Sequence, residues 1–137
     1  EYHLNTNKCI LIDDYAHHPK ELESLIKSLR ALYPKRKLFL IFQPHLFSRT
    51  KDLAKEFCDV LELADKIGIL DIYPAREKPI EGVSSKKLLK NIKLKNKWYI
   101  NDDNIDGILK KELTDLIVTA GAGDIYNLLP RIKKILK

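Results

Sequence analysis

Four short polar segments of this sequence hold most of the side chains that could bind a ligand or transfer a proton. Each follows an apolar run, and they cover residues 13–19, 43–50, 71–77 and 120–124. They contain three of the four histidines, the adjacent aspartates Asp13 and Asp14, and Arg49. Carboxylates and imidazoles can exchange protons, and a guanidinium can hold a carboxylate through two hydrogen bonds. These segments are therefore the candidate site.

The apolar runs that precede the segments have the length of buried strands, and they cover residues 9–12, 38–42, 67–70 and 116–119. Between them lie stretches with apolar residues at helical spacing. The clearest follows Pro19 and contains Leu22, Leu25, Ile26, Leu29 and Leu32. This alternation is typical of a parallel sheet covered by helices. We predict an α/β fold, with a Rossmann-like, open and mostly parallel sheet of about six strands and helices on both faces.

The remaining helices and strands are indicated by shorter apolar patterns. The first helix should end near Tyr33, and the second should bury a face formed by Leu53, Phe57, Val60, Leu61 and Ala64. Shorter helices are expected over residues 84–91 and 105–113, an edge strand over 98–100 and an extra hairpin strand within 2–7. The last helix should follow the glycine-containing turn at 121–123 and be kinked by Pro130. No repeat or internal boundary is visible, so residues 1–137 are taken as one domain.

In an open parallel sheet, ligands bind beyond the carboxyl ends of the strands, where loops meet helix N-termini. The four segments would then meet at one edge of the sheet. Each residue alone also has a structural explanation: Asp14 could satisfy loop N–H groups, His18 could start a helix, and Arg49 could form a surface ion pair. Gly121 and Gly123 could serve only tight packing. Convergence on one edge favours a binding site.

Composition narrows the classes of function. No apolar run approaches the roughly 20 residues that cross a bilayer, so we expect a cytoplasmic protein without a membrane partner. The net charge of +6 comes from scattered basic residues, and the lysine-rich stretch 86–97 carries no nucleic-acid-binding motif. Cys9 and Cys58 lack the spacing of a metal site or disulfide framework and are expected to be buried thiols. No glycine-rich phosphate loop ending in lysine occurs, so the chain alone should not hydrolyse ATP.

The motifs at residues 13–19 (DDYAHHP), 42–45 (FQPH) and 48–50 (SRT) resemble those of the C-terminal domain of the Mur ligase family. The resemblance covers essentially the whole chain and is strongest to the branch that joins L-alanine to UDP-N-acetylmuramate in peptidoglycan biosynthesis. It implies that ATP, with Mg²⁺, phosphorylates the muramate carboxylate, and that the amino group of L-alanine attacks the acyl phosphate. The nucleotide-sugar domain of the family is not in this sequence, and neither is the central ATPase domain, which mainly holds ATP and Mg²⁺.

The resemblance also implies roles for individual residues. Asp14 matches the position used on the ATP side, at the ribose. Tyr15, His17, His45 and Arg49 match positions for alanine recognition, and His17 is the candidate for assisting deprotonation of the amine. Where many family members have a second arginine after the histidine, this chain has Leu46. A clamp of two arginines on the alanine carboxylate is therefore not expected here.

Three alternatives remain open at this point. The family contains a related ligase that attaches a recycled muramyl peptide, although the complete DDYAHHP and FQPH motifs favour the alanine ligase. A receiver-like signalling domain would use Asp13 and Asp14 for magnesium and Asp71 for phosphate, but Gly121 stands where a lysine is expected. A metal-dependent phosphoesterase would use Asp13, Asp14, His17, His45 and Asp71, without the spacing of a known metal site.

Overall fold

The computed structural model describes residues 1–137 and contains one six-stranded sheet. The strand order is β1-β2-β6-β3-β4-β5. Only β1 runs antiparallel to its neighbour, and all other pairs are parallel. The strands are β1 (Tyr2–Asn5), β2 (Ile10–Asp14), β3 (Leu38–Phe42), β4 (Lys66–Ile69), β5 (Lys97–Tyr99) and β6 (Leu116–Ala120). The predicted α/β fold class is confirmed.

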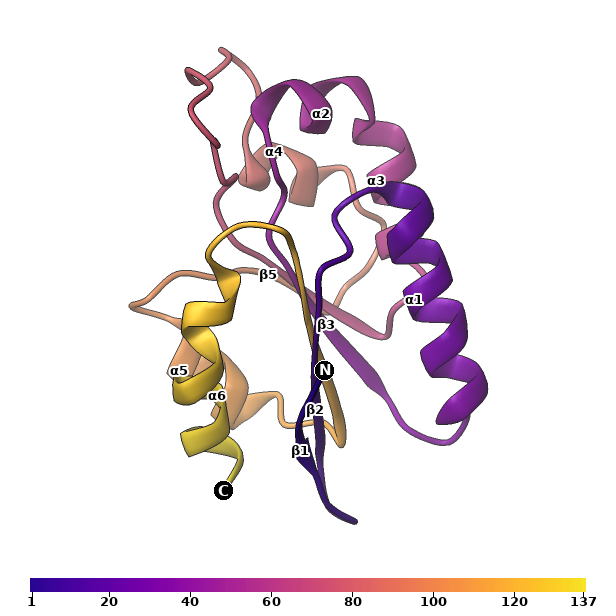
Figure 1. Ribbon diagram of the computed structural model, residues 1–137. Helices are drawn as coiled ribbons and strands as arrows, with labels where there is room; N and C mark the ends of the chain where they lie inside the picture. The colour runs from indigo at the N-terminus through magenta and orange to yellow at the C-terminus, as the bar shows by residue number, and fades with distance from the viewer.

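Helices cover both faces of this sheet (Figure 1). They are α1 (Pro19–Leu32), α2 (Phe47–Asp52), α3 (Ala54–Leu61), α4 (Ser85–Lys90), α5 (Ile105–Lys111), the 3-10 helix η1 (Ile125–Leu128) and α6 (Leu129–Leu136). Helices α1, α3 and α4 pack on one face, whereas α5, η1 and α6 pack on the other. None of these helices has the length and apolar character needed to cross a membrane.

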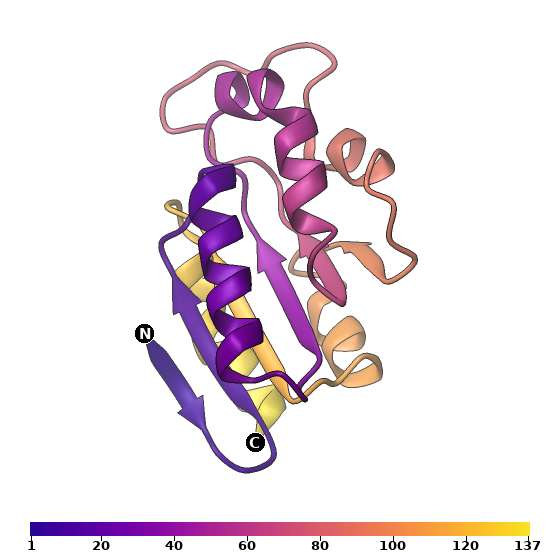
Figure 2. The same cartoon turned by 90° about the vertical axis from the view of Figure 1, so that its right-hand side faces the viewer.

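Alternation along the central strands explains the two cores. In β3, Leu38, Leu40 and Phe42 belong to the core under α1 and α3, while Phe39 and Ile41 belong to the core under α5 and α6. Successive side chains of a strand point to opposite faces, so a strand covered on both sides must be apolar throughout. All five residues of β3 are buried accordingly. Figure 2 shows β1 at the outer edge of the sheet beside β2.

The start of α1 follows directly from its sequence. His18 is the N-cap, Pro19 occupies the first turn, and the carboxylate of Glu21 accepts a hydrogen bond from the backbone N–H of His18 at 3.0 Å. This reciprocal arrangement is a capping box, which satisfies N–H groups that a helix start leaves free. His18 therefore has the structural role considered for it, and it fixes where the chain leaves β2.

Two predicted elements differ from the structure. The helix expected around Leu53 is α3, but a separate helix, α2, precedes it, and Leu53 lies at their junction with φ −113°. Pro130 does not kink the last helix, because η1 precedes it and Pro130 lies in the first turn of α6, where its missing N–H costs nothing. The predicted hairpin strand is confirmed as β1, and Cys9 and Cys58 are buried free thiols.

Candidate functional site

The structure brings the four polar segments together beyond the carboxyl ends of the strands. We call their connections the β2 loop (residues 15–18), the β3 loop (43–46), the β4 loop (70–77) and the β6 loop (121–124). Backbone hydrogen bonds join neighbours: the N–H of Gly121 donates to the carbonyl of Asp14 at 3.1 Å, and the N–H of Gln43 donates to the carbonyl of Ala120 at 3.0 Å. The expected convergence of the segments is thus a feature of the fold.

A row of aromatic rings crosses this edge. Tyr15 meets His17 edge to face at 5.3 Å between centroids, His17 lies 5.6 Å from His45, and His45 stacks on Tyr73 at 5.3 Å. The row runs from the β2 loop to the β4 loop, although β6 and β3 lie between β2 and β4 in the sheet. The β2 loop therefore reaches over the end of β6, and Tyr15 at its outer end is 70% exposed.

The β2 loop orients two of the predicted site residues. Asp14 accepts a hydrogen bond from the N–H of Ala16 at 2.9 Å, so one carboxylate oxygen holds the turn. His17 Nδ1 lies 2.9 Å from the carbonyl oxygen of Tyr15. Because a carbonyl only accepts, this contact places a proton on Nδ1, so Nε2 is the nitrogen that can gain or lose a proton. Asp13 accepts instead from the Thr119 hydroxyl at 2.6 Å, within the sheet.

The β3 loop carries His45 and leads into α2 with Arg49. Nδ1 of His45 is buried and has no hydrogen-bond partner within the chain. Burial, followed by the positive charges of His17 and Arg49, lowers the pKa of His45, so its imidazole is held neutral. Arg49 donates only a long hydrogen bond of 3.4 Å to the carbonyl of His45 and forms no ion pair. The surface ion pair considered for Arg49 is absent.

The resemblance to the Mur ligases implies no ligand contact in the β4 loop, yet this loop supports the β3 loop. Glu77 accepts hydrogen bonds from the backbone N–H of Ser48 at 3.1 Å and from its hydroxyl at 2.5 Å. These two bonds lower the pKa of Glu77. Asp71 accepts from the hydroxyl of Tyr99 at 2.8 Å. The only sequence feature that indicated Asp71 and Glu77 was their position after β4, because the residues that donate hydrogen bonds to them lie far away along the chain.

The β6 loop fills the space between its neighbours. A Cβ atom at Gly123 would lie 2.5 Å from Cγ of Tyr73 and 2.6 Å from Oε1 of Gln43, so glycine is required by close packing. Gln43 itself is buried, donating to Asp124 Oδ1 at 2.7 Å and accepting from the N–H of Ile125 at 3.1 Å. Tight packing, the structural explanation considered for the glycine pair, describes what Gly123 does.

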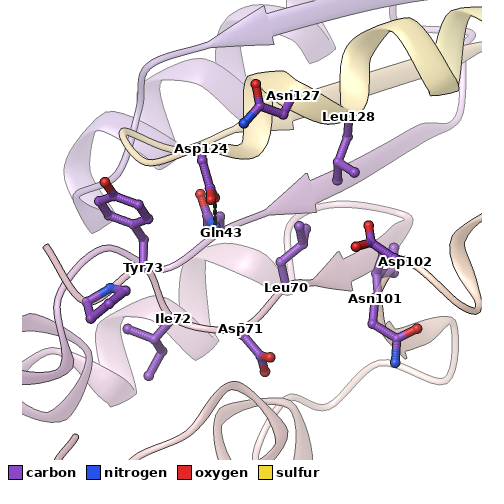
Figure 3. A pocket seen from close by; sticks show the side chains of 12 residues that line it. Gln43, Leu70, Asp71, Ile72, Tyr73, Asn101, Asp102, Asp124, Asn127 and Leu128 are labelled. Carbon is purple, nitrogen blue, oxygen red and sulfur yellow. Dashed lines mark hydrogen bonds between the residues drawn. The ribbon is translucent and has the colours of Figure 1, made fainter. Parts of the chain in front are cut away.

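A cavity of about 430 Å³ lies beside Tyr73, between the β4 loop and the β6 loop (Figure 3). Its polar lining consists of carboxylates and amides, mainly Gln43, Asp71, Asn101, Asp102, Asp124 and Asn127. His17, His45 and Arg49 do not line it. The dashed line in Figure 3 marks the bond between Gln43 and Asp124. The chain forms no group of three His, Cys, Asp or Glu side chains that could hold a metal ion.

Comparison with known proteins identifies the family. The profile of the family described as "Mur ligase, glutamate ligase domain" matches residues 1–125. This chain belongs to the Mur ligase family. A protein of Christiangramia forsetii named UDP-N-acetylmuramate–L-alanine ligase is 46% identical over 135 residues, and a protein of the same name from Flavobacterium psychrophilum is 47% identical over 133 residues.

These alignments cover 98% and 97% of this chain but 30% of each relative, so the chain spans about a third of their length. Among solved structures, the murein peptide ligase Mpl of Psychrobacter arcticus 273-4 has a TM-score of 0.75 at 17% identity. That match covers 99% of this chain and 29% of the other. At such low identity the likeness extends to the fold alone.

Within the Mur ligase domain, Leu46 takes an unusual conformation. It is the N-cap of α2 and has φ 73°, in the left-handed region that side chains other than glycine rarely adopt. Its N–H donates to the carbonyl of Tyr73 at 2.8 Å, and its carbonyl accepts from the Thr50 hydroxyl at 2.8 Å. The strained backbone is thus fixed on both sides, although the leucine side chain offers no charge to a ligand.

Proposed function

We propose that this chain is the C-terminal, amino-acid-binding part of the ATP-dependent ligase that joins L-alanine to UDP-N-acetylmuramate in peptidoglycan biosynthesis in the cytoplasm. One observation carries the proposal: the guanidinium of Arg49 forms no ion pair and lies next to His45, which belongs to the row of aromatic and imidazole rings. The names of the relatives at 46% and 47% identity support the choice of alanine as the amino acid.

Alanine offers a carboxylate and an amino group, and the site offers a matching group for each. Arg49 would hold the carboxylate through charge-assisted hydrogen bonds. His45, kept neutral by burial, can accept or donate without repelling the ammonium group. Tyr15 and His17 would close over the small substrate from the β2 loop. Because position 46 is leucine rather than a second arginine, Arg49 supplies the only guanidinium of the β3 loop and α2.

The amine must lose a proton before it can attack. In the proposed reaction, ATP first phosphorylates the muramate carboxylate; the alanine nitrogen then bonds to the acyl carbon, and phosphate leaves with the electrons of the broken C–O bond. His17 Nε2, opposite the nitrogen held by the Tyr15 carbonyl, would accept the proton that the amine releases. Holding the partners together and excluding water accounts for much of such a rate enhancement.

The nucleotide would touch this chain at Asp14. One oxygen of Asp14 already holds the β2 loop, but a carboxylate has further lone pairs and can still accept from a ribose hydroxyl. The residues present do not fit a Mg²⁺ site, since no cluster of metal-ligating side chains forms. ATP and Mg²⁺ would therefore be held mainly by a central domain, for which Mg²⁺ would neutralise phosphate charge.

A second candidate is the related ligase that accepts a recycled muramyl peptide. The cavity of about 430 Å³ beside Tyr73 favours it, because that volume exceeds what alanine needs. The high identity to alanine ligases weighs against it. The two functions differ in the amino component that drives phosphate release.

The test uses the full-length protein with ATP, Mg²⁺ and UDP-N-acetylmuramate. Phosphate release should depend on L-alanine and should be far weaker with the tripeptide. The 137-residue chain alone should release no phosphate with the same substrates, because it lacks a phosphate loop. A preference for tripeptide would select the second candidate, and sustained release by the isolated chain would overturn the assignment of ATP to another domain.

A further inference from the structure

The β4 loop and the β3 loop are joined as a short stretch of parallel ladder. The N–H of Tyr73 donates to the carbonyl of Pro44 at 2.8 Å, and the N–H of Leu46 donates to the carbonyl of Tyr73 at 2.8 Å. His45 lies between these two bonds and pairs with Tyr73 in an isolated bridge. Because both flanking residues are held, the backbone of His45 has one position relative to Tyr73.

The side chain of Tyr73 continues this contact. Its ring stacks on the ring of His45 with an interplanar angle of 25°. Gly123 approaches Tyr73 so closely that an added methyl group would overlap its Cβ and Cγ atoms. Tyr73 therefore contacts both the β6 loop and His45, so a shift of the β6 loop would move the ring that stacks on His45.

Glu77 acts at the next point along the same two segments. Helix α2 has no cap of its own, since its N-cap is Leu46, whose side chain cannot accept a hydrogen bond. The carboxylate of Glu77 supplies the missing acceptor through the N–H and hydroxyl of Ser48. A negative charge at this end also favours the helix through its dipole. Arg49 follows Ser48 in the chain, so the place where α2 begins determines the position of the Arg49 backbone, from which the guanidinium side chain extends.

We propose that Tyr73 and Glu77 are positioning residues of the alanine site, with Tyr73 fixing His45 and Glu77 fixing Arg49. The inference rests on the proposed function, since it takes His45 and Arg49 as alanine ligands. Neither supporting residue needs to touch alanine. Their effect is to remove freedom from the two side chains that do, and binding groups held loosely lose affinity even when present.

The first experiment changes Glu77 in the full-length enzyme. Glu77→Ala should raise the KM for alanine about tenfold, since misplacing a group by about 1 Å can cost up to about 100-fold. Glu77→Gln keeps an oxygen that can accept from Ser48 and should give a smaller rise. The KM for ATP should stay unchanged in both. Glu81→Ala is the matched control, because Glu81 is exposed and forms no ion pair.

The second experiment tests the aromatic contact. Tyr73→Phe keeps the stacking ring and should behave like the wild type, whereas Tyr73→Ala should raise the KM for alanine. Gly123→Ala should displace Tyr73 and have the same selective effect, although Tyr73 and His45 themselves are not substituted. Gly107→Ala is its control, because nothing lies within 4 Å of a Cβ added there.

The outcomes separate the two proposals. If the wild-type enzyme shows no alanine-dependent phosphate release, the proposed function fails. If it does show such release, yet Glu77→Ala and Tyr73→Ala keep the wild-type KM for alanine, the positioning roles are wrong and the function stands. Equal rises in the KM for alanine and for ATP would also overturn the positioning roles, since a general loosening of the domain predicts no selectivity.

Discussion

At the amino-terminal ends of the strands polar side chains pair with one another, whereas at the carboxyl ends several have no partner in the chain. Before β4, Asp65 accepts from Arg30 at 2.7 Å and from the backbone N–H of Leu38 at 2.8 Å. Lys66 pairs with Glu112 at 3.1 Å. Such closed networks leave nothing for a ligand and serve the fold.

The opposite edge has the features of a site held ready for a ligand. All three residues other than glycine with positive φ lie in its loops or at the start of α2, and they are Leu46, Ala75 and Arg76. The buried Nδ1 of His45 lacks a partner, and neither Arg49 nor Arg76 forms an ion pair. Backbone strain and unsatisfied polar groups persist where binding uses them. The comparison supports the proposal that the carboxyl edge binds the ligand, whereas the amino-terminal edge stabilises the fold.

The largest expected effect is on stability, at the amino-terminal edge. Asp65→Ala removes a salt bridge and leaves the N–H of buried Leu38 without its acceptor, so the free energy of unfolding should fall by about 2–3 kcal/mol. Denaturant unfolding of the purified protein measures this. The KM for alanine in the full-length enzyme should not change. A selective rise in that KM would break the division between the edges.

The next effect is on alanine binding, at the carboxyl edge. Arg49→Lys keeps the charge but loses the planar fork, so the KM for alanine should rise roughly tenfold, which corresponds to about 1.4 kcal/mol. The KM for ATP and the melting temperature should stay near their wild-type values, because Arg49 contributes no ion pair to the fold. Wild-type alanine dependence in a folded variant would return Arg49 to a structural role.

A smaller effect is expected at Asp14. In the full-length enzyme Asp14→Ala should weaken the use of ATP by about fivefold, the loss of roughly 1 kcal/mol of hydrogen bonding. The use of alanine should change less. Steady-state kinetics with each substrate varied in turn distinguishes the two. Equal effects would mean that Asp14 only holds the β2 loop through Ala16.

The smallest effect concerns pH. Burial lowers the pKa of His45 in the folded chain, so between the unfolded value of about 6.5 and the folded value only the unfolded chain takes up the proton. The contribution of His45 to stability is therefore complete above about pH 6.5 and is lost as the pH falls through the folded pKa. Histidine NMR titration should place His45 below 6.5. A raised pKa would contradict the neutral imidazole.

Much of the fold was predictable because burial leaves a local pattern. The apolar run at residues 38–42 coincides with β3, and the helical spacing after Pro19 gives α1 with its capping box. Helix α2 was missed because its six residues have no apolar period and its cap comes from Glu77, about thirty positions later. A signal carried by a distant residue is invisible to any local window.

The sequence by itself determined the α/β class, the parallel strands and the gathering of Asp14, His17, His45 and Arg49 at one edge, since hydrophobic periodicity and strand direction suffice for those. Tertiary structure alone decided which groups are satisfied and which remain open. Asp65 and Arg49 are both charged residues near strand ends, yet one is paired and the other is not. That difference depends on contacts between loops from separate strands, and such contacts exist only once the sheet has formed.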